Sequence, residues 1–133
     1  MRSFSPSPLL RWALLADAAA SGAMCLLMLL GAGPLGRLLS LSAGLLSGAG
    51  LVLLPYAALI AWLGSRASLT RPAVWVVIGI NAVWAADSLL LLASGWVQPN
   101  GLGQAFIIAQ ALAVALFAEL QFLGLRRPAP AMV

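Results

Sequence analysis

Histidine is absent from the sequence, and cysteine occurs only once, as Cys25. Without histidine the chain cannot form a Ser-His-Asp triad or a Cys-His pair, and it lacks the usual ligands of haem iron and most zinc sites. A single cysteine cannot form an intrachain disulfide. Cys25 lies in the apolar stretch AMCLLMLL, where we expect a buried hydrophobic side chain and no reactive thiol. The sequence therefore predicts no enzyme, no metal and no cofactor.

Charged residues are also scarce. They make up 8% of the chain, against about 25% in a soluble domain. Hydrophobic residues make up 63%, and the mean hydropathy is +1.07. Such a chain cannot cover a water-facing surface, so its main partner should be the lipid bilayer. The net charge of +4 comes from arginines scattered singly between apolar runs, which indicates membrane-flanking charges and no nucleic-acid partner.

Four apolar runs are long enough to cross a bilayer as helices, which takes about 20 residues. They cover roughly residues 9–30, 43–63, 73–94 and 102–123. The runs do not alternate with a period of two, so membrane strands are not expected. The connections are short, and Pro34 to Leu41 could form a helical turn at the interface. We predict a single all-α membrane domain, residues 1–133, folded as an up-down-up-down four-helix bundle.

The two halves of the chain end their first spans alike, with MCLLMLLGAG in one and ADSLLLLASG in the other. The bundle could therefore consist of two parallel helical hairpin repeats. Six of the seven arginines lie in the N-terminal part, the second connection and the C-terminal tail, and only Arg37 lies in the first connection. Because positive charge favours the cytoplasmic side, we predict that both termini are cytoplasmic.

Two features of the second span bear on packing. Gly44 and Gly48 form a GxxxG motif, which lets membrane helices approach closely. We expect this motif to pack inside the chain, with a dimer face as the alternative. Pro55 lies within the same span and predicts a kink, because proline removes a backbone donor.

Polar residues inside the spans are costly and mark candidate sites. At a rise of about 1.5 Å per residue, Asp17 and Asn81 lie about 3 to 5 Å to the inner side of the membrane centre. Asp87 and Gln110 lie about 4 to 6 Å to its outer side. We therefore expect an inner layer that joins Asp17 with Asn81, and an outer layer that pairs Asp87 with Gln110.

Glu119 lies nearer the inner ends of the spans, about 9 Å from the centre. It could join the inner layer, but an ion pair near the interface is the simpler expectation. The candidate partners are Arg11, Arg126 and Arg127.

The stretch NAVWAADSLL places Asn81 and Ser88 on one helical face, flanked by Trp84 and Asp87. Two interpretations remain open. In the first, Asp87 is protonated or hydrogen-bonded and fixes the helix register, because an isolated carboxylate in low dielectric takes up a proton. In the second, these side chains line a small cavity that holds a polar headgroup, a cation or a proton.

The favoured function is a non-catalytic interaction protein, either a self-assembling bundle or an accessory subunit of a larger membrane complex. One alternative is a small proton-coupled transporter of hydrophobic or cationic compounds. Asp17 in the first span resembles, by position, the acid of small multidrug resistance exporters, but their glutamate and their aromatic and glycine pattern are missing here. Another alternative is a binder of lipid or of a hydrophobic small molecule.

The stretches LLPYAALIAWL, NAVWAADSLLLL and AELQFLGLRR resemble, in length and pattern, small bacterial four-helix membrane proteins such as those grouped as DoxX-like. The resemblance extends over the whole chain in general form and includes no diagnostic motif. It implies a multi-pass protein of the bacterial inner membrane and no defined activity.

Overall fold

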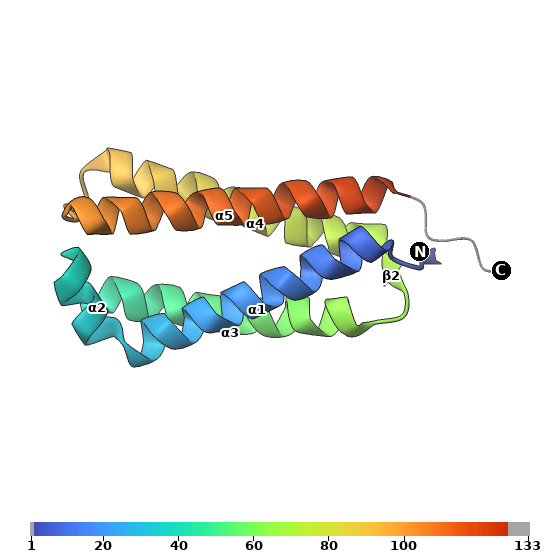
Figure 1. Cartoon of the computed structure of the whole chain (residues 1–133), viewed down its shortest axis with the longest axis horizontal. Helices are drawn as coiled ribbons and strands as arrows, with labels where there is room; N and C mark the ends of the chain where they lie inside the picture. Colours follow the sequence, from blue (N-terminus) through green and yellow to red (C-terminus); the bar gives the residue numbers. More distant parts are fainter. Residues whose placement is uncertain (1, 128–133) are drawn as a thin grey trace.

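A computed structural model describes residues 2–127 and consists almost entirely of helices (Figure 1). Four of the helices are long and apolar enough to span a membrane, which confirms the all-α prediction. In chain order, the elements are β1 (Ser3–Phe4), α1 (Pro8–Leu30), α2 (Ala32–Leu39), α3 (Ala43–Ser65), β2 (Leu69–Thr70), α4 (Arg71–Ser94) and α5 (Gly101–Arg126).

The ends of the helices follow local capping chemistry. The side chains of Ser7, Ser42 and Asn100 each accept a hydrogen bond from a backbone N–H in the first turn of α1, α3 and α5. Gly95 ends α4 with a φ of 81°, a left-handed conformation that glycine adopts readily. The long helices extend beyond the predicted spans by no more than three residues at either end. The predicted interfacial turn is α2, whose Arg37 is exposed.

The long helices form two hairpins, α1 with α3 and α4 with α5, which Figure 1 shows one above the other. Helix α1 packs against both α3 and α5, whereas α3 and α4 have little direct contact. The bundle is therefore closed on three sides and open along the seam between α3 and α4. This seam is where a site can be reached from the surrounding lipid.

Two glycines permit close helix crossings near the chain termini. A Cβ on Gly124 of α5 would lie 2.6 Å from the backbone nitrogen of Leu10, and a Cβ on Gly64 of α3 would lie 2.8 Å from a methyl carbon of Leu15. Ser7 adds a hydrogen bond of 2.7 Å from its hydroxyl to the carbonyl of Gly124. These contacts hold α1 against its neighbours at the end of the bundle where both described chain ends lie.

The expectation that Gly44 and Gly48 pack inside the chain is wrong. A Cβ at either position would meet nothing within 4 Å, because both glycines face the open seam. Helix α3 continues through Pro55, whose ring is exposed. The predicted kink at this proline remains a prediction.

The end that carries the chain termini also carries the described arginines other than Arg37, and we call it the arginine-rich end. The guanidinium of Arg11 donates to the carbonyl oxygens of Gly64 at 2.7 Å and Arg66 at 3.0 Å. Arg126 lies over the ring of Phe122 at 5.6 Å. Carbonyl oxygens stabilise the charge of Arg11, and an aromatic ring stabilises that of Arg126.

The ion pair expected for Glu119 is not formed. Glu119 is exposed on α5, and it takes part in none of the side-chain hydrogen bonds found within residues 2–127. Arg11 and Arg126 have the other partners described above, and Arg127 is exposed beyond the end of α5. The carboxylate therefore points to the surroundings of the bundle.

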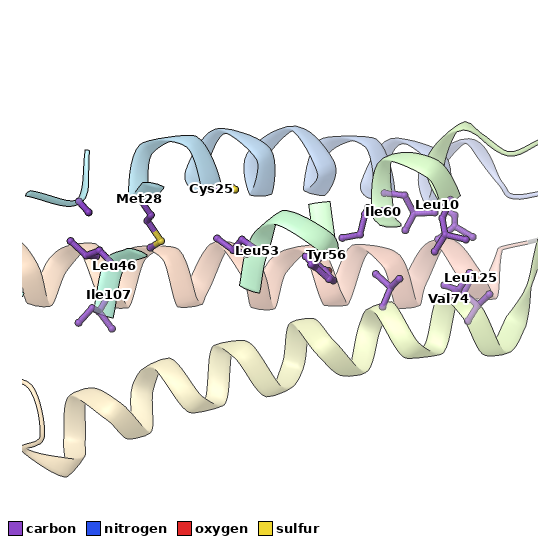
Figure 2. Close-up of a cluster of buried hydrophobic side chains, with 14 of the residues drawn as sticks. Leu10, Cys25, Met28, Leu46, Leu53, Tyr56, Ile60, Val74, Ile107 and Leu125 are labelled. Atoms are coloured by element: carbon purple, nitrogen blue, oxygen red, sulfur yellow. The ribbon is translucent and has the colours of Figure 1, made fainter. Parts of the chain in front are cut away.

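The most completely buried apolar side chains lie toward the arginine-rich end. Leu10, Ile60 and Val74 are fully buried there, and Figure 2 shows them gathered between the helices with Leu125. The buried residues of α4 are Val74, Val77, Asn81 and Ala85, and none of the nine residues after Ala85 is buried. Figure 2 shows α4 diverging from the other helices toward the opposite end. The divergence produces the opening described below.

Candidate functional site: a polar node and a lateral groove

Asp17 lies at the centre of a buried polar cluster that joins the four long helices. Its side chain is 1% exposed. The Oδ2 atom accepts hydrogen bonds from the amides of Asn81 on α4 and Gln121 on α5, each at 2.8 Å. It also lies 3.0 Å from the hydroxyl of Tyr56 on α3. The hydroxyl of Ser21, one turn along α1, donates to Oδ1 at 3.0 Å. We call these five residues the polar node.

Two further hydrogen bonds link the partners of Asp17 to one another. The amide of Asn81 donates to Oε1 of Gln121 at 3.0 Å, and the hydroxyl of Tyr56 donates to Oδ1 of Asn81 at 2.6 Å. No buried side-chain nitrogen or oxygen within residues 2–127 lacks a partner. In a bilayer, where water cannot compensate, such a network fixes the register of every helix that contributes to it.

The polar node contains no cation, because its donors are two amides and two hydroxyls. The single hydroxyl proton of Tyr56 has two acceptors in reach, Asn81 at 2.6 Å and Asp17 at 3.0 Å. When it points to Asn81, the Tyr56 oxygen can accept a proton donated by the Asp17 carboxyl. The same heavy-atom positions thus suit Asp17 with or without a proton.

A groove opens along the seam between α3 and α4, on the side of the polar node away from the arginine-rich end. Its volume is about 430 Å³. Its walls come from the first half of α3, the second half of α4 and the facing turns of α5. They are mostly apolar and include Leu46, Val52, Leu91, Phe106 and Ile107. The glycines of the GxxxG motif form part of the α3 wall.

The polar side chains of this wall are Trp84, Asp87, Ser88 and Gln110. The indole nitrogen of Trp84 donates to Oε1 of Gln110 at 2.9 Å, and the hydroxyl of Ser88 donates to the carbonyl of Trp84 at 2.8 Å. The predicted pairing of Asp87 with Gln110 is therefore wrong. The amide nitrogen of Gln110, which a carboxylate would need as donor, instead donates to the carbonyl of Ile107 at 2.9 Å. Asp87 is exposed at the lip of the groove, and within residues 2–127 its carboxylate has no hydrogen-bond partner.

A smaller cavity of about 40 Å³ lies between the groove and the polar node. Val52 and Trp84 line both this cavity and the groove, and Ser21, Tyr56 and Asn81 belong to the node. A cavity of this size has room for a water molecule, which needs about 10 to 15 Å³ of such space. The node is thus separated from the groove by no more than a small cavity, to whose lining Ser21, Tyr56 and Asn81 contribute.

The predicted inner layer exists in part. Asp17 and Asn81 meet as expected, whereas Glu119 lies outside the node. The sequence analysis did not place Ser21, Tyr56 or Gln121 in this layer. Ser21 follows Asp17 by four residues on one helix face, and Tyr56 is the single tyrosine of the chain. Both positions were visible in the sequence, but only the packing of helices reveals their common partner.

Comparisons with family models, with curated proteins and with solved structures give no match to this chain. No group of three or more histidine, cysteine, aspartate or glutamate side chains within the described residues is arranged to hold a metal ion. The geometry of the node and the groove is therefore the basis for the functional argument.

Proposed function

We propose that this protein is a non-catalytic membrane protein that binds a hydrophobic or amphipathic molecule, such as a lipid chain, in the groove between α3 and α4. The observation that carries the proposal is the groove itself, with about 430 Å³ of space and mostly apolar walls. Ligand pockets usually have about 300 to 1,000 Å³, apolar linings and a few placed polar groups. The groove has these properties, and it lies on the open side of the bundle.

The position of the groove supports entry from the bilayer. Its walls belong to helices that are long and apolar enough to span a membrane, so its opening faces hydrocarbon. An apolar ligand could then move sideways from lipid into the groove without crossing water. The polar node supports the same function by holding the two hairpins together next to the groove.

Native mass spectrometry after extraction in a mild nonionic detergent tests this proposal. The wild-type protein should carry a defined lipid or hydrophobic molecule. Gly48→Leu should lose that extra mass, because a side chain at position 48 projects into open space in the groove. Gly22→Leu is the matched control, since Gly22 on α1 also has open space and lies outside the groove.

Retention of the same mass by Gly48→Leu would argue against binding in the groove. Recovery of the chain only as part of a complex with other subunits would instead favour the accessory-subunit function. A homo-oligomer that carries the ligand is compatible with binding. In each case, we propose a multi-pass location in the bacterial inner membrane with both termini cytoplasmic, which the arginine-rich end supports.

Proton-coupled transport is the second candidate function. It is favoured by the polar node, whose hydrogen bonds suit Asp17 in either protonation state, and by the small cavity that leads from it toward the groove. Asp17→Asn should abolish proton-driven uptake or efflux of a groove ligand in proteoliposomes and leave its equilibrium binding intact. Equal transport by the variant and the wild type would exclude Asp17 as the coupling residue.

A further inference from the structure

We propose that the groove selects a cationic amphiphile, a molecule with an apolar body and a protonated amine, and that Asp87 binds the amine. This inference rests on the proposed binding function and names the chemical class of the ligand. It starts from a difference in hydrogen bonding among the polar side chains of the groove. The other polar side chains in its wall have hydrogen-bond partners inside the described part of the chain, whereas the carboxylate of Asp87 has none.

An unpaired carboxylate is costly at the depth in the membrane where Asp87 lies. Asp87 lies about 7 Å from the midpoint of α4 along the helix axis, at about 1.5 Å per residue. The hydrocarbon core extends about 15 Å to each side of the membrane centre. The carboxylate therefore lies within the apolar region, where ionisable groups face a partner, a cavity or a functional ligand.

The described arginines of the same chain do not supply that partner. Arg71 begins α4, about 24 Å along the helix from Asp87. Arg37 lies on α2, at the same end of the bundle as the groove, but its guanidinium lies beside the start of its own helix, 3.7 Å from where a Cβ of Gly33 would be. The cation that neutralises Asp87 should then come from outside the chain.

The neighbours of Asp87 favour an amine over other charged groups. Trp84 and Asp87 together line both the groove and a second, shallow hollow. Aromatic faces attract ammonium groups, and a carboxylate beside one repels phosphate or carboxylate ligands. The hydroxyl of Ser88 offers a further acceptor next to the same opening. The apolar walls would hold the body of the ligand while its amine stays at the lip.

Two ligands of equal chain length separate charge recognition from apolar binding. Dodecylamine is protonated at neutral pH, and dodecanol is its neutral counterpart. Each is titrated against the full-length protein in a nonionic micelle, and the bound fraction is measured by native mass spectrometry. Competition from the detergent acts on both ligands alike. We expect the wild type to bind the amine at least about tenfold more tightly than the alcohol, as a charge-assisted contact implies.

Three variants complete the test. Asp87→Asn should bind both ligands with the affinity that the wild type has for dodecanol, because it keeps the shape of the side chain and removes its charge. Glu119→Gln should keep the amine preference, since it neutralises an exposed acid outside the groove. Gly48→Leu should lose both ligands, and its thermal unfolding should match that of Gly22→Leu.

The outcomes distinguish this inference from the proposed function. Equal binding of amine and alcohol by the wild type, or an amine preference that survives in Asp87→Asn, would overturn the cationic site and leave the groove as an apolar site. Failure of the wild type to bind either ligand would overturn both. Where the amine preference holds, adding phosphatidylethanolamine identifies the source of the amine. If phosphatidylethanolamine competes with dodecylamine, the amine belongs to a lipid headgroup. If it does not compete, the amine belongs to a free amphiphile.

Discussion

Asp17 and Asp87 are carboxylates of two membrane-spanning helices in one small bundle, and their surroundings are opposite. Asp17 is 1% exposed and accepts hydrogen bonds from side chains of the four long helices. Asp87 is exposed at the lip of a groove, without a hydrogen-bond partner in the described chain. Depth in the membrane does not explain the contrast. Helix α4 is packed near Asn81 and diverges beyond Ala85, so the first acid is enclosed and the second is not.

We propose from this contrast that Asp17 has a structural role and that Asp87 binds a ligand. Where the helices meet, polar groups satisfy one another and fix the register of the bundle. Where the helices separate, the same kinds of side chain remain available to a molecule from outside. The same substitution made at Asp17 and at Asp87 should therefore have unequal effects.

The largest expected difference is between Asp17→Ala and Asp87→Ala. Asp17→Ala leaves the buried donors of Ser21, Asn81 and Gln121 without their acceptor, and we expect a loss of about 3 kcal/mol in the free energy of unfolding. Asp87→Ala should change it by less than about 0.5 kcal/mol, because no described hydrogen bond is lost. Titration with denaturing detergent in mixed micelles measures both. Equal losses would contradict the division of roles.

The next effect concerns the helix crossings at the arginine-rich end. Gly124→Ala places a methyl group 2.6 Å from the backbone nitrogen of Leu10, so α1 and α5 must separate. We expect a loss of about 2 kcal/mol, in the range of overpacked cores. Gly22→Ala, which has open space, should leave the unfolding free energy unchanged or raise it slightly. A tolerated Gly124→Ala would show that this crossing is looser than the structure indicates.

A smaller effect is expected for Tyr56→Phe, which removes only a hydroxyl. That hydroxyl lies 2.6 Å from Oδ1 of Asn81 and 3.0 Å from Oδ2 of Asp17. We expect a loss of about 1 kcal/mol, typical of a buried hydrogen bond. A double-mutant cycle with Asn81→Ala should give a coupling of at least about 0.5 kcal/mol. Additive effects of the two substitutions would indicate that Tyr56 is not part of the polar node.

The sequence predicted the four spans well because a long apolar run needs only the bilayer to become a helix. It also predicted that Asp17 and Asn81 meet, since both lie at similar depth. It could not predict that Trp84 takes the amide oxygen of Gln110, because depth and helix face do not fix which helices touch. Helices α4 and α5 do pack together, but Trp84 and not Asp87 is the residue of α4 that contacts Gln110.

The GxxxG motif shows the same limit. Its spacing indicates a helix face suited to close approach, but the spacing does not say which helix approaches it. In this chain close crossings occur at other glycines, among them Gly64 and Gly124, which the sequence did not distinguish. The motif lies instead on the wall of the groove.

The smallest expected effect is that of Gly48→Ala, which tests whether the groove is an opening in the isolated protein or the seat of another helix. The added methyl group would meet nothing within 4 Å. Alanine lowers the entropy of the unfolded chain, so we expect a gain of about 0.5 kcal/mol in detergent. The same substitution should leave the oligomeric mass unchanged in native mass spectrometry. A loss of stability together with a change in mass would mean that a helix of a second chain packs on Gly48, and the groove would then be a protein interface and no ligand site.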